Sequence, residues 1–137
     1  MKWSFTVPIT TSDAYERVLL ALCCWREARG ESIQAQRGVI WTILNRAAKP
    51  SWWGKDIVSV ILAPSQFSSF NKSDPNSLLF PSNVDVVFRE ILLLAADPGD
   101  DPTSGATSYN SLPMDNQPAW AAEMTKTCDI GAFHFYK

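Results

Sequence analysis

The stretch that decides the fold reads DAYERVLLALCCWREA and occupies residues 13–28. Ser12 or Asp13 can cap its beginning, and Gly30 follows its end, which are typical signals of helix termini. Apolar side chains recur at helical spacing and also fill its other faces: Tyr15, Val18, Leu19, Leu22 and Cys23, with Leu20, Ala21, Cys24 and Trp25. A helix that is apolar nearly all round is buried. We therefore expect a central helix around which the rest of the chain packs.

Three further helices are expected after the central one. The second covers residues 32–48, ends before Pro50, and contains Gly38, where another helix is expected to approach closely. The third covers residues 56–62. A structured loop spans residues 64–81, and the fourth helix follows a cap at Ser82 with Asp85 three residues later. Its apolar stripe has helical spacing: Val84, Val87, Phe88, Ile91, Leu92 and Ala95.

The C-terminal third of the chain predicts a small sheet. Residues 97–105 form an exposed acidic loop, and residues 106–110 and 130–136 form two short strands. A short helix over residues 118–126 lies between them, with Pro118 in its first turn. The expected fold class is α+β, mainly α, with a buried central helix and a small C-terminal sheet like a β-hairpin. Residues 1–137 are expected to form a single catalytic domain.

Composition excludes several classes of protein. Of the 137 residues, 46% are hydrophobic, which excludes a disordered chain, and the formal net charge of −2 argues against a nucleic-acid-binding protein. The three cysteines, Cys23, Cys24 and Cys128, form no spaced, even set, so we expect reduced thiols. One histidine makes a His-rich metal site impossible. We expect neither a metal nor another cofactor.

No targeting segment is recognisable. The N-terminus has no long apolar run after its lysine, and residues 18–25 are too few to span a bilayer. We expect a monomer that is made in the cytoplasm without a signal peptide and has no stable association with a membrane. If its substrate lies outside the membrane, another factor must release it.

Glu27 is the candidate general acid. It lies near the end of the buried helix, where burial and the negative end of the helix dipole should both raise its pKa. A carboxyl group that keeps its proton near neutral pH can protonate a glycosidic oxygen. The alternative is an ordinary glutamate at a helix end, paired with Arg26 or Arg29. Glu31 either pairs with Glu27 or belongs to the first turn of the second helix.

The tryptophans leave two interpretations open. Trp52 and Trp53 lie in a loop between Pro50 and Gly54, and either stack on sugar rings or fill the gap between two helices. The helical positions of three others favour the core: Trp25, Trp41 and Trp120.

The cysteines of residues 13–28 do not favour a thiol hydrolase. Cys23 or Cys24 with His134 would supply a nucleophile and a base. Both thiols lie deep in an apolar helix, however, and this raises their pKa.

Six short motifs, in order, resemble those of the SleB-type cell-wall hydrolases. They are Glu27-Ala-Arg-Gly-Glu31, Gln36-Arg-Gly38, Ile43-Leu-Asn-Arg46, Pro64-Ser-Gln-Phe-Ser68, Gly105-Ala-Thr-Ser-Tyr109 and Pro118-Ala-Trp-Ala121, before a closing Ile130-Gly-Ala-Phe-His-Phe-Tyr136. The resemblance extends from about residue 14 to residue 137. It implies a lysozyme-like helical domain that acts on the glycan strands of peptidoglycan. In the closing motif, the histidine of the family would fall at Phe133, whereas this chain has His134.

The resemblance also implies site residues. Glu27 matches the catalytic acid. Gln66 matches a glutamine that lines the cleft, and its neighbours Phe67 and Ser68 are included with it as substrate-binding residues. Tyr109 and Asn110 look like a Tyr–Asn pair that lytic transglycosylases place near the catalytic glutamate. Trp52 and Trp53 complete the expected substrate-binding set.

The implied reaction is cleavage of the MurNAc–GlcNAc bond. The chain offers one well-placed carboxylate, which favours a lytic transglycosylase over a two-carboxylate glycosidase. Asp56, Asp74 and Glu31 remain candidates for a second carboxylate. The expected biological setting is a phage endolysin released by a holin. Alternatives are a hydrolysing muramidase, a non-catalytic glycan-binding or virion module, and a thiol amidase.

Overall fold

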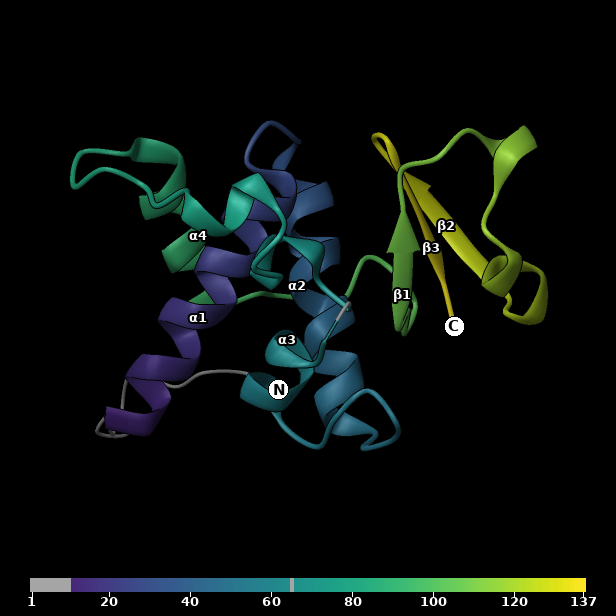
Figure 1. The fold of residues 1–137 in the computed structure, drawn as a ribbon, viewed down its shortest axis with the longest axis horizontal. Coiled ribbons are helices and arrows are strands. Elements are labelled where there is room, and N and C mark those ends of the chain that lie inside the picture. Colours follow the sequence, from purple (N-terminus) through teal and green to yellow (C-terminus); the bar gives the residue numbers. More distant parts are fainter. Residues whose placement is uncertain (1–10, 65) are drawn as a thin grey trace.

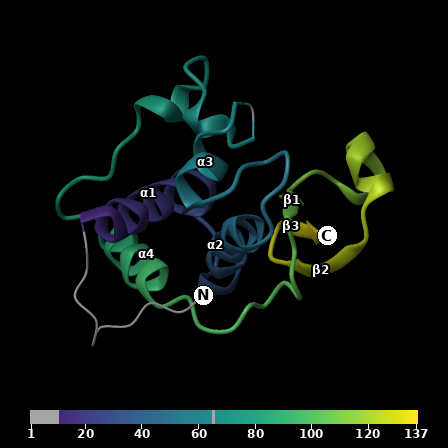
Figure 2. The ribbon, with the colours of Figure 1, turned by 90° about the horizontal axis from the view of Figure 1, so that it is seen from below.

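The computed structural model describes residues 11–64 and 66–137. Its helices gather on one side and a small sheet lies on the other (Figure 1). Helix α1 (Thr11–Ala28) packs against α2 (Ile33–Ala48), α3 (Ile57–Leu62) and α4 (Val86–Ala96). The turned view shows the sheet beyond α2, away from α1 and α4 (Figure 2). None of the described helices is long and apolar enough to cross a membrane.

The C-terminal part of α1 is the buried centre of the fold. Leu20, Cys23 and Cys24 are fully buried, which confirms the expected central helix there. Tyr15 and Val18 are instead 57% and 52% exposed. The 11 residues of α4 cover only part of the 18-residue α1. The expected cap is wrong, because α1 begins at Thr11 and Ser12 and Asp13 belong to its first turn.

Helix α2 begins where the sequence predicts, with the Ser32 side chain accepting a hydrogen bond from the backbone N–H of Ala35. The role expected for Gly38 needs correction. A Cβ at this position would lie 2.6 Å from Cζ of Phe135. Gly38 therefore makes room for an aromatic ring from the sheet, and not for another helix.

The segment between α3 and α4 has more structure than an ordinary loop. Asp56 caps α3 through a capping box with Ser59. The following segment contains two short 3-10 helices, η1 (Ser68–Phe70) and η2 (Pro75–Leu78). Helix α4 is capped by Asp85, which accepts from the N–H of Phe88, so the predicted cap at Ser82 is wrong.

The sheet has three antiparallel strands in the order β1-β3-β2. They are β1 (Ser108–Asn110), β2 (Lys126–Ile130) and β3 (Phe133–Tyr136). The predicted single strand over residues 130–136 is interrupted by a turn at Gly131, whose φ is 56°. The predicted helix over residues 118–126 is replaced by the 3-10 helix η4 (Ala119–Glu123) and the start of β2, after η3 (Met114–Asn116).

The acidic loop over residues 97–105 is held in place more firmly than the sequence indicates. Thr103 is fully buried, and Asp101 accepts hydrogen bonds from Thr103, Gly105 and the Asn45 side chain. This network attaches the loop to α2 and fixes the start of β1, which carries the site described below.

Candidate active site

Glu27 meets the sheet through one hydrogen bond. It is half-buried in the last turn of α1, and the hydroxyl group of Tyr109 on β1 donates to its Oε1 over 2.9 Å. The two residues are 82 positions apart in the sequence. Tyr109 in turn packs on the rings of Phe133 and Phe135. The helical side and the sheet therefore converge at this carboxyl group.

The surroundings raise the pKa of Glu27. Burial is the main cause, and the negative charge of Asp74 acts in the same direction. The hydroxyl groups of Tyr109 and Ser69 oppose the rise because they favour the carboxylate. The net result is a carboxyl group that holds its proton more strongly than an ordinary glutamate, as a general acid requires.

The alternative in which an arginine neutralises Glu27 is not observed. Arg26 is buried, and its guanidinium donates to the backbone carbonyls of Ser69, Ser77 and Leu79. It also lies against the rings of Phe70 and Phe80. Arg26 thus fastens the segment over residues 66–80 to α1, next to Glu27.

Arg29 does not neutralise Glu27 either. It donates to the backbone carbonyls of Trp25 and Arg26 and to the side chain of Asn76. No described ion pair involves Glu27.

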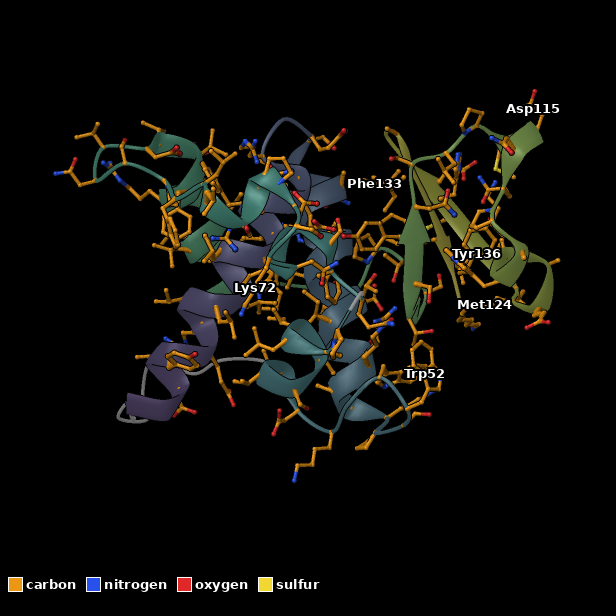
Figure 3. All side chains as sticks on the ribbon, viewed as in Figure 1. Trp52, Lys72, Asp115, Met124, Phe133 and Tyr136 are labelled. Carbon is orange, nitrogen blue, oxygen red and sulfur yellow. The ribbon has the colours of Figure 1, made fainter. Side chains whose placement is uncertain are left out.

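A pocket of about 330 Å³ lies between the end of α2 and the sheet. Figure 3 labels two of the residues beside it, Trp52 after α2 and Met124 before β2. Its lining consists of Arg46, Trp52, Gln66, Ser108, Tyr109, Trp120 and Met124. Tyr109 lines the pocket and also donates a hydrogen bond to Glu27, so it connects the candidate acid to the pocket.

Trp52 and Trp53 have different environments. Trp52 is 72% exposed and lines the pocket, whereas Trp53 is half-buried and its indole N–H donates to the carbonyls of Arg46 and Lys49. Trp53 is thus a packing residue in this structure. Trp25 is buried and Trp41 is half-buried, as expected, but Trp120 is 37% exposed and lines the pocket. The assignment of Trp120 to the core is wrong because its segment is a surface 3-10 helix.

The three predicted substrate-binding residues around Gln66 also have different environments. Gln66 lines the pocket, but Phe67 is buried beneath the guanidinium of Arg46, and Ser68 is exposed without lining the pocket. The neighbouring Ser69 was not predicted as a site residue, yet it is the buried serine that lowers the pKa of Glu27. Nothing in the sequence distinguishes these two adjacent serines.

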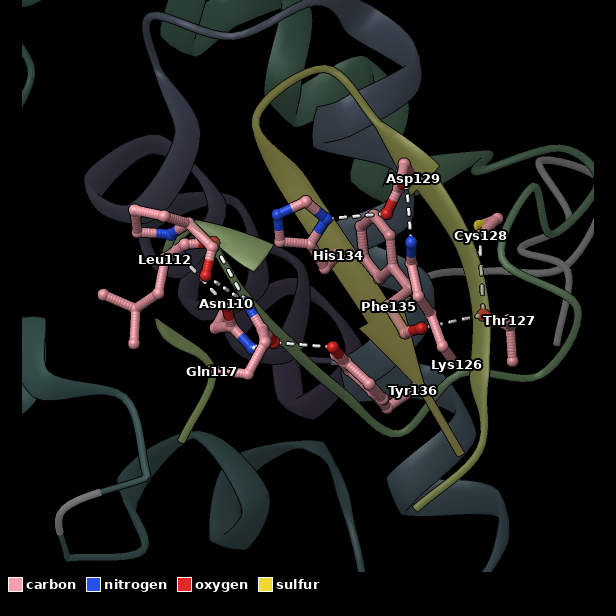
Figure 4. A network of polar contacts seen from close by, with 11 residues as sticks. Asn110, Leu112, Gln117, Lys126, Thr127, Cys128, Asp129, His134, Phe135 and Tyr136 are labelled. Carbon is pink, nitrogen blue, oxygen red and sulfur yellow. Dashed lines mark hydrogen bonds and ion pairs between the residues drawn. The ribbon is translucent and has the colours of Figure 1, made fainter. Parts of the chain in front are cut away.

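Asn110 does not join Tyr109 at Glu27. Successive residues of a strand face opposite sides of a sheet. The Asn110 side chain exchanges two hydrogen bonds with that of Gln117 and also accepts one from the N–H of Leu112 (Figure 4). Asn110 is thus hydrogen-bonded to Gln117 and Leu112, and its expected role in binding substrate stays a prediction.

His134 lies away from the pocket as well. Its ring Nδ1 lies 2.6 Å from Oδ1 of Asp129, which also binds Lys126 (Figure 4). The one-residue displacement from the family position thus turns His134 to the other face from the buried Phe133.

The other carboxylates and the thiols have separate environments. Asp56 caps α3, and the Glu31 carboxylate lies near Gly131 in the β2–β3 turn. Of the three candidate partners, only Asp74 acts on the pKa of Glu27. Cys23 and Cys24 are fully buried, which raises the pKa of both thiols and makes them poor nucleophiles. Among the described residues, no group of His, Cys, Asp and Glu side chains could hold a metal ion.

Comparison with known proteins identifies the family. The sequence matches the Cell Wall Hydrolase family over residues 30–136. The chain belongs to the cell-wall hydrolase family. The match begins three residues after Glu27, so it includes the pocket and Tyr109 but not the candidate acid. No curated protein matches the chain at a significant level.

Two solved structures resemble this cell-wall hydrolase over almost its whole length. The catalytic domain of the germination-specific lytic transglycosylase SleB from Bacillus anthracis is 27% identical, with a TM-score of 0.73 over 96% of this chain and all of that one. The catalytic domain of Bacillus cereus SleB is also 27% identical, with a TM-score of 0.71 over 98% of each chain. These similarities confirm the resemblance to SleB-type enzymes and the mainly helical α+β fold.

Proposed function

We propose that this cell-wall hydrolase cleaves the β-1,4 bond between MurNAc and GlcNAc in peptidoglycan as a lytic transglycosylase, with Glu27 as its catalytic residue. The observation that carries the proposal is the half-buried Glu27 carboxyl, with its raised pKa, bound to Tyr109 at the edge of the pocket. The similar SleB domain from Bacillus anthracis belongs to a germination-specific lytic transglycosylase, and this supports the proposal.

The proposed reaction uses Glu27 twice. Its proton passes to the glycosidic oxygen as the bond from that oxygen to C1 of MurNAc breaks, and the GlcNAc end leaves as an alcohol. The 6-hydroxyl of the same MurNAc then attacks C1 and gives its proton to the Glu27 carboxylate. The product is a 1,6-anhydro sugar, no water is consumed, and Glu27 ends in its initial protonated form.

Tyr109 has a defined role in this proposal. Its hydroxyl donates to the carboxylate that forms when Glu27 loses its proton, and so stabilises charge as it develops. Ser69 acts on the same carboxylate from the segment that Arg26 holds. Gln66 and Trp52 line the adjacent pocket, where they are available to contact the sugar chain.

A hydrolysing muramidase is the second candidate, and Asp74 is the observation that favours it. The charge of Asp74 raises the pKa of Glu27, so a second carboxylate acts on the site. Such a group would activate water in a two-carboxylate mechanism. Asp74→Asn separates the two routes, because it should strongly reduce hydrolysis but leave a one-carboxylate reaction largely intact.

The test is digestion of purified peptidoglycan, followed by turbidity and by mass spectrometry of the released fragments. We expect fragments ending in a 1,6-anhydro group, which lack one water relative to reducing ends. Glu27→Gln should lower the rate at least about 100-fold, as expected for loss of a general acid. Glu31→Gln is the matched control and should retain activity. Equal rates for the wild type and Glu27→Gln would refute the proposal. Phage origin and holin-type release remain predictions that this assay does not address.

A further inference from the structure

Arg46 is a buried cation without a carboxylate partner among the described residues. Only 6% of it is exposed, and neither described ion pair includes it. Its guanidinium donates to the carbonyl of Thr107 and, over 3.4 Å each, to the side chains of Gln66 and Ser108. All three partners are neutral. Burial of an uncompensated charge is costly, so a nearby anion would be strongly favoured.

The guanidinium of Arg46 also has N–H groups for which no acceptor is found among the described residues. Arginine offers five N–H groups in a fixed fork, and the described residues accept three of them. The rings of Trp53 and Phe67 lie 5.7 and 5.6 Å from it and restrict its orientation. A planar, fixed fork of this kind is suited to bidentate binding of a carboxylate.

This cation faces the pocket beside Glu27. Arg46 is the one charged side chain among the described residues that line it, and the exposed Trp52 and Trp120 supply apolar surface. Tyr109 joins the same pocket to the acid. The space of about 330 Å³ therefore combines a positive group with aromatic rings that suit the face of a sugar.

We infer that Arg46 makes this pocket a subsite for the free 3-O-lactyl carboxylate that MurNAc carries where its stem peptide has been removed. The inference rests on the proposed function and adds a determinant of specificity to it. MurNAc and GlcNAc alternate along the strand and differ only in the lactyl group. On such peptide-free strands, a cation that binds this group places MurNAc at a fixed distance from Glu27 and so selects one of the two β-1,4 linkages for cleavage.

The test compares two forms of the same glycan strands. Strands freed of stem peptides carry lactyl carboxylates, and coupling them to methylamine gives neutral amides of similar size. The wild type should cleave the acid form with a kcat/KM at least about 10-fold higher, as expected for a charge-assisted pair. Arg46→Gln should reduce this ratio to near one, and Arg46→Lys should keep part of it. Arg37→Gln removes a charge from the same helix outside the pocket and should leave the ratio unchanged.

The outcomes distinguish the subsite from a structural role of Arg46 and from failure of the proposed function. If the wild type cleaves the acid and amide strands with nearly equal kcat/KM, the inferred subsite is refuted. This result does not depend on whether Arg46→Gln folds. Equal losses on both substrates in a folded Arg46→Gln also overturn the subsite. Binding is measured separately in the Glu27→Gln background. Preference of that variant for acid strands supports the subsite even if the wild type cleaves neither form, whereas cleavage without a preference supports only the proposed function.

Discussion

The hydroxyl group of Tyr109 donates a 2.9 Å hydrogen bond to Glu27 and thereby joins β1 to the last turn of α1. This bond favours the carboxylate and holds the pKa of Glu27 below the value that burial alone would produce. The same contact acts on the acid before proton transfer and on the carboxylate after it. It therefore affects both the pH range and the rate of the proposed reaction.

Tyr109→Phe should move the pH profile upward. Without the hydroxyl, the pKa of Glu27 rises further, so the carboxyl keeps its proton to higher pH and the basic limb of kcat/KM shifts in that direction. The maximal rate should fall about 10-fold, because the carboxylate formed on proton transfer loses one hydrogen bond. Tyr136→Phe is the control, since that hydroxyl donates to Gln117 on the other side of the sheet. An unshifted basic limb in Tyr109→Phe would contradict this assignment.

Local signals in the sequence predicted most of the helices but little of the sheet. Ser32 and Asp56 each form a cap with a residue three positions later, so α2 and α3 were predicted nearly to the residue. The turn at Gly131 lies within an apolar run that is typical of one strand, and β2 is largely polar. Its pairing with β3 depends on contacts that local periodicity does not record.

For the site, too, local sequence signals indicated single residues but not the contacts between segments that are far apart in the sequence. The place of Glu27 on a buried helix made it a candidate acid, whereas the contact with Tyr109 joins segments 82 residues apart and has no local signal. Arg46 lies at a buried position of α2, where an arginine is unusual, and this was the available signal for it. The different partners of Tyr109 and Asn110 follow from the strand, because neighbouring residues of a strand face opposite sides and Tyr109 faces Glu27.

Gly38→Ala should destabilise the fold although alanine favours helices. The new Cβ would lie 2.6 Å from Cζ of Phe135, a fully buried ring with little freedom to move. Overpacking of this kind costs about 1–3 kcal/mol, against a gain of about 1 kcal/mol in helix propensity. We expect a net loss of about 1 kcal/mol in the free energy of unfolding, measured with urea. Gly30→Ala has open space around it and should change stability much less. A Gly38→Ala protein more stable than the wild type would contradict the close approach.

Arg26→Met should release the segment over residues 66–80. The change removes three hydrogen bonds to backbone carbonyls and the contacts with Phe70 and Phe80, at a cost of about 2–3 kcal/mol. Lys72, labelled in Figure 3, is exposed in this segment and reports on it through trypsin cleavage. We expect faster cleavage after Lys72 and lower activity, because the segment carries Ser69.

The control for Arg26 is Arg89→Met on the exposed surface of α4. It should leave the cleavage rate at Lys72 and the free energy of unfolding nearly unchanged, within about 0.5 kcal/mol. If Arg26→Met also leaves cleavage at Lys72 unchanged, the guanidinium does not hold this segment.

Asp101→Asn should weaken the fold near neutral pH and much less in acid. Burial raises the pKa of Asp101, but hydrogen bonds from Thr103, Asn45 and Gly105 outweigh it and the net pKa is lowered. A carboxyl whose pKa is lower in the folded state stabilises the protein above its ordinary pKa of about 3.9, and this stability is lost as the pH falls through the folded-state value. Asparagine would also turn an N–H₂ group toward the donors of Asn45 and Gly105.

The measurement is urea denaturation of the wild type and Asp101→Asn at pH 7 and again near pH 3. We expect a loss of about 2 kcal/mol at pH 7, from two hydrogen bonds removed, and a smaller difference in acid. Asp100→Asn, at the exposed neighbouring position, should differ from the wild type by less than about 0.5 kcal/mol at either pH. Because Asp101 connects α2 to the loop that leads into β1, Asp101→Asn should also lower activity by disturbing Tyr109. A loss of stability that is the same at both pH values would show that the charge of Asp101 contributes nothing.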